Sequence, residues 1–152
     1  MIQRCYYKKV HKYKPEYKNK TVCEEWLNYA NFRIWFDEHY VPIKNNQVDL
    51  DKDLLVQGNK VYSPETCVCL SHYINTMFEG KRGDCVYEND DGTYSVDNKK
   101  DNTYKTYEEA VEYVIERQQE RILNVAEKCK GTIPNVAYEA MLNWDVRTAI
   151  CG

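Results

Sequence analysis

The stretch LDKDLLVQGNKVYSPETCVCLSHYIN, residues 50–75, decides the fold. Apolar and polar residues alternate across residues 48–51, which predicts a short strand. Gly58 lies in a turn signal, and the apolar run at residues 67–70 predicts a second strand. Ser71 can cap the helix that follows. The expected order is therefore strand, long turn, strand and helix.

This order brings an acid and an amide toward one point. Asp51 ends the first strand, and Asn75 lies on the predicted helix. Carboxylate and amide oxygens are ligands that hard cations such as Mg²⁺ take in proteins. We therefore expect Asp51 and Asn75 to face one another across a pocket, with Mg²⁺ as the ion if a metal binds.

Cysteines offer a second candidate metal site. Cys67 and Cys69 occupy alternate strand positions and so share one face. Together with His72, Cys5 and Cys23 they could form a zinc site, but no second closely spaced cysteine pair accompanies them. Buried, inert thiols are the favoured interpretation, so zinc is not expected.

The N-terminal segment is strongly basic. Residues 1–20 hold seven Lys or Arg and one acid, whereas residues 21–152 hold fourteen Lys or Arg and twenty-three acids. Tyrosines interleave the cations, and this combination suits a phosphate backbone and unstacked bases. Charge alone does not decide between that function and a solvated arm. The candidate nucleic-acid-binding residues are Arg4, Lys8, Lys9, Lys12, Lys14, Lys18 and Lys20.

Helix signals flank the deciding stretch on both sides. Aromatic residues at helical spacing across residues 29–40 predict an amphipathic helix, capped by Asn28, whose aromatic side faces the core. Further along, a turn signal at Gly92 predicts a hairpin. Thr106 and Glu109 form a capping box for a long helix, and one more helix is expected near the C-terminus.

The length of 152 residues fits one domain of ordinary size or two small modules that share one core. The order of strands and helices predicts an α+β fold, with modules at residues 1–80 and 81–152. No run of about eighteen apolar residues is present, so no membrane helix is expected. The N-terminus lacks the apolar core of a signal peptide, and the cysteine count of seven is odd. Both features favour reduced thiols and a cytoplasmic protein.

Several segments together resemble a phage family of HNH homing-endonuclease-like proteins. They are Cys-x-x-Trp-Leu at residues 23–27, the deciding stretch with its Tyr-Ser-Pro-Glu-Thr-Cys segment, and TYKTYEEAVEYV at residues 103–114. The resemblance implies a small ββα-metal centre with flanking helices. It also implies a second module similar to the plant ethylene-responsive-factor DNA-binding domain, here reduced to a short hairpin packed on two helices.

The resemblance assigns roles at the first module. Asp51 matches the family's metal-binding acid and Asn75 its helix ligand, while Lys52 stands at the general-base position and Thr66 at that of the orienting asparagine. At pH 7, roughly one lysine amine in a thousand or fewer is neutral. The resemblance therefore implies a degenerate site, with His72 as the alternative base.

The second module departs from the resembled domain because its sheet is acidic rather than basic, and acids there repel phosphate. A solvated turn and a surface that meets a basic groove of a protein are both compatible with this charge. The candidate acidic surface consists of Glu88, Asp90, Asp91, Asp97 and Asp101.

Two functions follow from the resemblance. One is a phage-derived binding protein on a decayed nuclease scaffold, which engages nucleic acid or inhibits a host defence enzyme that processes nucleic acid. The alternative is a Mg²⁺-dependent homing or nicking endonuclease. The lysine at the general-base position favours the first, and the oligomeric state stays open.

Overall fold

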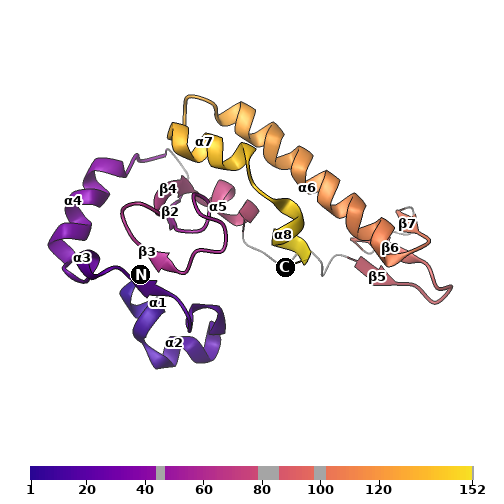
Figure 1. The fold of residues 1–152 in the computed structure, drawn as a ribbon, viewed down its shortest axis with the longest axis horizontal. Coiled ribbons are helices and arrows are strands. Elements are labelled where there is room, and N and C mark those ends of the chain that lie inside the picture. Colours follow the sequence, from indigo (N-terminus) through magenta and orange to yellow (C-terminus); the bar gives the residue numbers. More distant parts are fainter. Residues whose placement is uncertain (44–46, 79–85, 98–101, 152) are drawn as a thin grey trace. The chain divides into compact units, whose positions relative to one another are not determined.

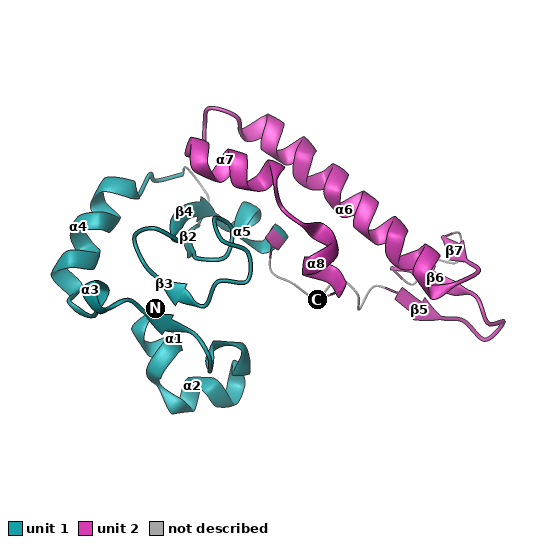
Figure 2. Cartoon of the chain, viewed as in Figure 1, with its two compact units in different colours: residues 1–77 teal, residues 78–152 magenta. Residues whose placement is uncertain are grey.

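The computed structural model describes residues 1–43, 47–78, 86–97 and 102–151. It confirms a mixed α+β protein in which the sheets are small (Figure 1). The chain divides into two compact units, residues 1–77 and residues 78–152 (Figure 2). Across the described ranges, no helix combines the length and apolar character that a bilayer crossing requires.

The first unit opens with three short helical segments. They are α1 (Ile2–Tyr6), α2 (Lys8–Tyr13) and the 3-10 turn η1 (Pro15–Tyr17). The side chain of Cys5 anchors α1 in the core, whereas none of the residues of α2 or η1 is buried. The basic segment is therefore helical, and most of its side chains lie on the surface.

Two small sheets hold the centre of the first unit. Strand β1 (Thr21–Val22) pairs in parallel with β3 (Val61–Tyr62), and β2 (Val48–Asp51) pairs antiparallel with β4 (Val68–Ser71). Helix α5 (His72–Phe78) follows β4 without a loop. The predicted sequence of strand, turn, strand and helix is thereby confirmed.

The core of this unit forms around Trp26, which is 1% exposed on the short helix α3 (Glu24–Leu27). Its side chain packs with four other buried residues, Cys5, Val22, Tyr62 and Cys67. Strand β1, strand β3 and helix α1 therefore share one small core with α3.

Helix α4 (Tyr29–His39) begins as predicted, because the Asn28 side chain accepts a hydrogen bond from Ala30 N at 3.0 Å. The expectation that its aromatic side enters the core is wrong in part. Phe32 and Trp35 pack half-buried against the core, but none of the residues of α4 is fully buried. The reason is that α4 packs mainly on the four-residue α3, which is too small to cover it.

In the second unit the sheet has three antiparallel strands in the order β5 (Val86–Glu88), β6 (Tyr94–Val96) and β7 (Thr103–Tyr104). The predicted hairpin is confirmed, and Gly92 in its turn has the positive φ of 79° that glycine adopts readily. The expectation of a hairpin alone is wrong. Strand β7 is only two residues long, too short for an alternating pattern to reveal.

Helix α6 (Tyr107–Cys129) packs on all three strands of this sheet. The predicted capping box is confirmed, with Thr106 accepting from Glu109 N at 3.2 Å and the Glu109 side chain bonding back. Two further helices follow, α7 (Asn135–Leu142) and α8 (Val146–Cys151), so the unit has one helix more than expected. The core lies along one side of α6, where Val114 and Ile122 are almost fully buried.

Candidate functional site

A polar cluster lies where β2 meets α5. Asp49 stands in the middle of β2, opposite Leu70 of β4, and His72 and Asn75 lie on the first turns of α5. The Ser71 hydroxyl accepts from Ile74 N at 3.3 Å and so caps the helix, as predicted. These local bonds fix the start of α5 beside the start of β2.

Asp49 is the centre of the cluster. Its Oδ2 lies 2.6 Å from His72 Nδ1 and 3.2 Å from Asn75 Nδ2, and its Oδ1 lies 2.7 Å from Gln47 Nε2. The Asp49 side chain is 18% exposed, whereas that of His72 is 53% exposed. Burial alone would raise the pKa of Asp49, but hydrogen bonds from His72 and Gln47 hold it below its ordinary value.

The contact between Asp49 and His72 fixes the chemistry of the imidazole. An ionised carboxylate only accepts hydrogen bonds, so His72 donates its Nδ1 proton to Asp49. The second ring nitrogen, Nε2, is then the atom at which the neutral ring can accept a proton. The pair therefore has the arrangement of a base oriented by a carboxylate, on a side chain that solvent reaches.

Asp51 has a different environment from Asp49. It is 8% exposed, and its Oδ1 accepts from Asp53 N at 2.9 Å and Leu54 N at 2.6 Å. Burial raises the pKa of Asp51, an effect that the Leu54 N–H opposes and the nearby Asp53 carboxylate increases. Asp51 thus caps the turn after β2 and fits poorly as the ligand of a hydrated Mg²⁺.

Lys52 is buried beside Asp51, with an exposure of 5%. Its Nζ forms an ion pair with Asp53 Oδ2 and lies 5.5 Å from the centre of the Tyr62 ring. Within the described ranges, Asp53 Oδ1 is buried without a hydrogen-bond partner. Lys52 therefore serves as a buried counter-ion of Asp53, whose side chain is 34% exposed.

Thr66 closes the turn that precedes β4. Its hydroxyl donates to Val61 O at 2.9 Å and lies 3.1 Å from the Ser63 hydroxyl. These bonds hold the Tyr-Ser-Pro-Glu-Thr-Cys segment against β3. The orienting role that the resemblance implies for Thr66 stays a prediction.

The structure thus joins Asn75 to Asp49, whereas the sequence prediction paired it with Asp51. Sequence reasoning missed Asp49 because the family resemblance selected the acid that precedes Lys52. One signal could have found it: Asp49 and Asp51 are two residues apart on one strand, so both point to the same side of the sheet. The alternating pattern of the strand does not tell which of the two carboxylates accepts hydrogen bonds from the backbone.

The four cysteines considered for zinc are free thiols, and Cys5 and Cys67 lie in the core. Burial raises the pKa of Cys67 to about 12 and that of Cys69 to about 11, which disfavours the thiolate. Among the residues that the structure describes, no group of three or more His, Cys, Asp or Glu is arranged to hold a metal ion.

The basic segment presents most of its cations to solvent, since Lys20 alone among the seven candidates is half-buried. Burial lowers the pKa of Lys20, whose Nζ lies 3.5 Å from Asn59 O. Arg4 lies against Tyr17, with its guanidinium carbon 5.5 Å from the ring centre. Tyr13 is 86% exposed, so an aromatic face stands among the lysines.

The candidate acidic surface is divided in its roles. Asp91 accepts from Thr93 within the hairpin turn, and Asp97 forms an ion pair with Arg117 at 2.5 Å. Glu88 and Asp90 are exposed. Asp101 lies outside the described residues. Two of the five acids therefore hold local structure.

Comparison with known proteins found no match to a protein-family model, to a curated protein or to a solved structure.

Proposed function

We propose that the protein binds nucleic acid through its basic N-terminal segment, on a scaffold that resembles a nuclease without serving as one. The observation that carries this proposal is the surface of α1, α2 and η1. Six cations of this segment are exposed there: Arg4, Lys8, Lys9, Lys12, Lys14 and Lys18.

Positive charge and exposed aromatic rings on this surface provide the two contributions to affinity that such binding needs. Lysines that neutralise phosphates release counterions, which gives affinity without sequence preference. Exposed tyrosine rings, above all Tyr13, add stacking worth about 1–3 kcal/mol per base in single strands. The proposed partner is therefore single-stranded nucleic acid or a frayed duplex.

The structural roles of Asp51 and Lys52 favour binding over cleavage. Asp51 caps a turn and Lys52 neutralises Asp53, so the acid and the base position that the resemblance assigns to cleavage both stabilise the fold. A residue buried in this way has little access to a phosphodiester.

The test is fluorescence anisotropy of a labelled single-stranded oligonucleotide at several salt concentrations. Replacing four exposed lysines with alanine should weaken binding and reduce the slope of log K against log salt by about 3, since each phosphate contact contributes about 0.7. The four are Lys8, Lys9, Lys12 and Lys14.

A matched control removes four exposed lysines elsewhere: Lys60, Lys105, Lys128 and Lys130. The control variant changes the net charge by the same amount as the first variant. If binding depends on the basic segment, the control keeps the wild-type slope of log K against log salt. Equal effects of both variants, or an unchanged slope in the first, would refute the proposal.

A second candidate, metal-dependent cleavage of DNA, is favoured by the pair of Asp49 and His72. Asn75 Nδ2 donates to Asp49 Oδ2 at 3.2 Å, and the ligand atoms for Mg²⁺ would be the carboxylate oxygens of Asp49 and the amide oxygen of Asn75. A bound divalent cation would stabilise charge on the leaving phosphate oxygen. His72, oriented by Asp49, would take a proton at Nε2.

Metal binding at this cluster can be tested without an activity assay. If the cluster holds an ion, Mg²⁺ or Mn²⁺ should raise the melting temperature of the wild type and not that of Asp49→Asn. An equal rise in both proteins, or none in either, would remove the second candidate.

A further inference from the structure

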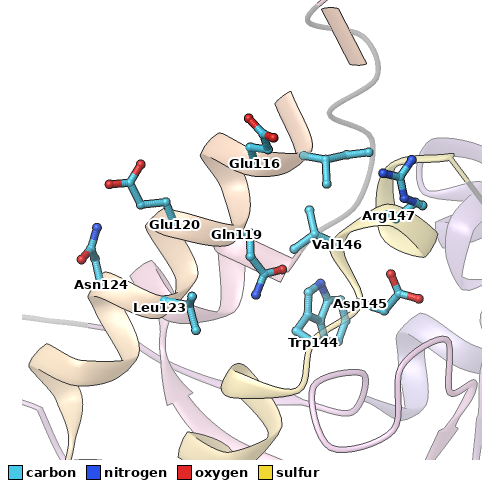
Figure 3. Close-up of a pocket in the computed structure, with 10 residues that line it drawn as sticks. Glu116, Gln119, Glu120, Leu123, Asn124, Trp144, Asp145, Val146 and Arg147 are labelled. Carbon is cyan, nitrogen blue, oxygen red and sulfur yellow. The ribbon is translucent and has the colours of Figure 1, made fainter. Parts of the chain in front are cut away.

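The second unit contains a groove of about 700 Å³ between α6 and the segment that joins α7 to α8. Figure 3 shows Gln119 and Leu123 of α6 on the side that faces Trp144 and Val146. Leu123 is 39% exposed, so the groove offers apolar surface that solvent reaches. The groove therefore has an apolar floor.

The rim of the groove is acidic. Glu116 and Glu120 extend from α6 on its outer side (Figure 3), and within the described ranges neither takes part in an ion pair. The cation at the rim, Arg147, already pairs with Glu112 through two contacts of 2.6 and 2.7 Å. The rim thus keeps a negative charge that a cationic partner would neutralise.

We propose that this groove binds residues 8–14 of a second copy of the chain. This segment, KKVHKYK, contains four lysines and no acid. None of the residues of α2 is buried in its own unit, and Tyr13 is 86% exposed. The segment complements the groove chemically, because its tyrosine ring suits the apolar floor and its lysines suit the acidic rim.

The dimensions agree with this occupant. At about 1.5 Å per residue, the six residues of α2 span about 9 Å. The groove follows α6 from Ile115 to Asn124, which is about 14 Å by the same rise. A helix of this length can place Tyr13 over Leu123 while its lysines reach the carboxylates of the rim.

The contact joins two different surfaces, so it is heterologous and leads to closed rings or to longer chains. In both arrangements the mean mass of the assemblies increases with protein concentration. Because the attraction is between exposed charges, it weakens as salt is added. The inference does not require nucleic acid, and its test is independent of the anisotropy experiment.

Sedimentation velocity at low salt, over a series of protein concentrations, measures this association. The mean mass of the wild type should exceed the 18.1 kDa of one chain and rise with protein concentration toward twice that mass or more. Two variants should stay monomeric: Lys9→Glu with Lys12→Glu in the segment, and Glu116→Lys with Glu120→Lys in the groove.

Mixing the two variants is the decisive step. Each variant alone has lost the attraction between segment and groove, but in the mixture the unchanged segment of one variant meets the unchanged groove of the other, so association should return. A control with Lys60→Glu and Lys105→Glu, two exposed lysines outside the segment, should associate like the wild type.

Circular dichroism of each variant establishes that it is folded. A wild type that stays at 18.1 kDa throughout would overturn the proposal, whether the groove is then filled within one chain or by another protein. So would a mixture of the two variants that remains monomeric, or a control that loses association as fully as they do.

Discussion

Replacing Asp51 with alanine removes the acceptor of two backbone hydrogen bonds at a site that is 8% exposed. Asp53 N and Leu54 N, at 2.9 and 2.6 Å from Asp51 Oδ1, would then lack that partner. Each such bond contributes about 1 kcal/mol net, and the relief of a buried charge offsets part of the loss. We expect a loss of about 2 kcal/mol for two bonds of this kind.

The matched substitution is Asp51→Asn, which keeps an oxygen at Oδ1 and removes the charge. If Asp51 acts as a cap, Asn should retain most of the stability, within about 1 kcal/mol of the wild type.

Urea unfolding measures the effect, followed by tryptophan fluorescence, to which Trp26, 1% exposed in the same unit as Asp51, contributes. With a slope of about 2 kcal/mol per molar, the alanine variant should unfold at a urea concentration about 1 M lower. An alanine variant as stable as the wild type would refute the assignment of Asp51 as a cap. So would an asparagine variant that loses as much stability as alanine.

Burial raises the pKa of Asp51, so this carboxyl favours folding while protonated, and its contribution is lost as pH rises through the raised pKa. The stability of Asp51→Asn relative to the wild type should therefore increase from about pH 4 to pH 7, as thermal unfolding would show. Ile122→Ala, at 0% exposure on α6, should cost about 2–5 kcal/mol in urea unfolding, and Leu123→Ala, at 39%, far less. Thr106→Ala removes the cap of α6 and should cost about 1 kcal/mol by the same measurement.

Helix ends and turns were predictable because their signals are local. Asn28, Ser71 and Thr106 each cap the helix that the sequence assigned to them. Gly92 has the positive φ of the expected turn. In each case the residue and the backbone groups it serves lie within a few positions of one another.

Pairing between distant segments could not be predicted in the same way. The parallel contact of Thr21 with Val61 joins two-residue strands separated by forty positions, and neither strand is long enough to show a period. Likewise, the aromatic spacing of α4 marks its apolar side correctly. It carries no information on how much of that side the neighbouring α3 can cover.

The contact between β2 and α5 was predicted to the element, and the sequence pattern did not reveal which residue of β2 makes it. Strand β2 and helix α5 do meet through an acid and Asn75. The choice between Asp49 and Asp51 depends on which carboxylate the backbone of residues 53–54 captures, and that is a three-dimensional property. The burial of Lys52 against Tyr62 is of the same kind.

The central claim is that the protein binds nucleic acid through its basic segment and does not cut it. Supercoiled plasmid incubated with the protein and Mg²⁺ or Mn²⁺ tests this most directly, with each sample run on a gel before and after removal of the protein. We predict retarded plasmid before removal and intact supercoiled plasmid after it. Relaxed or linear plasmid that the wild type produces and His72→Ala does not would contradict the claim.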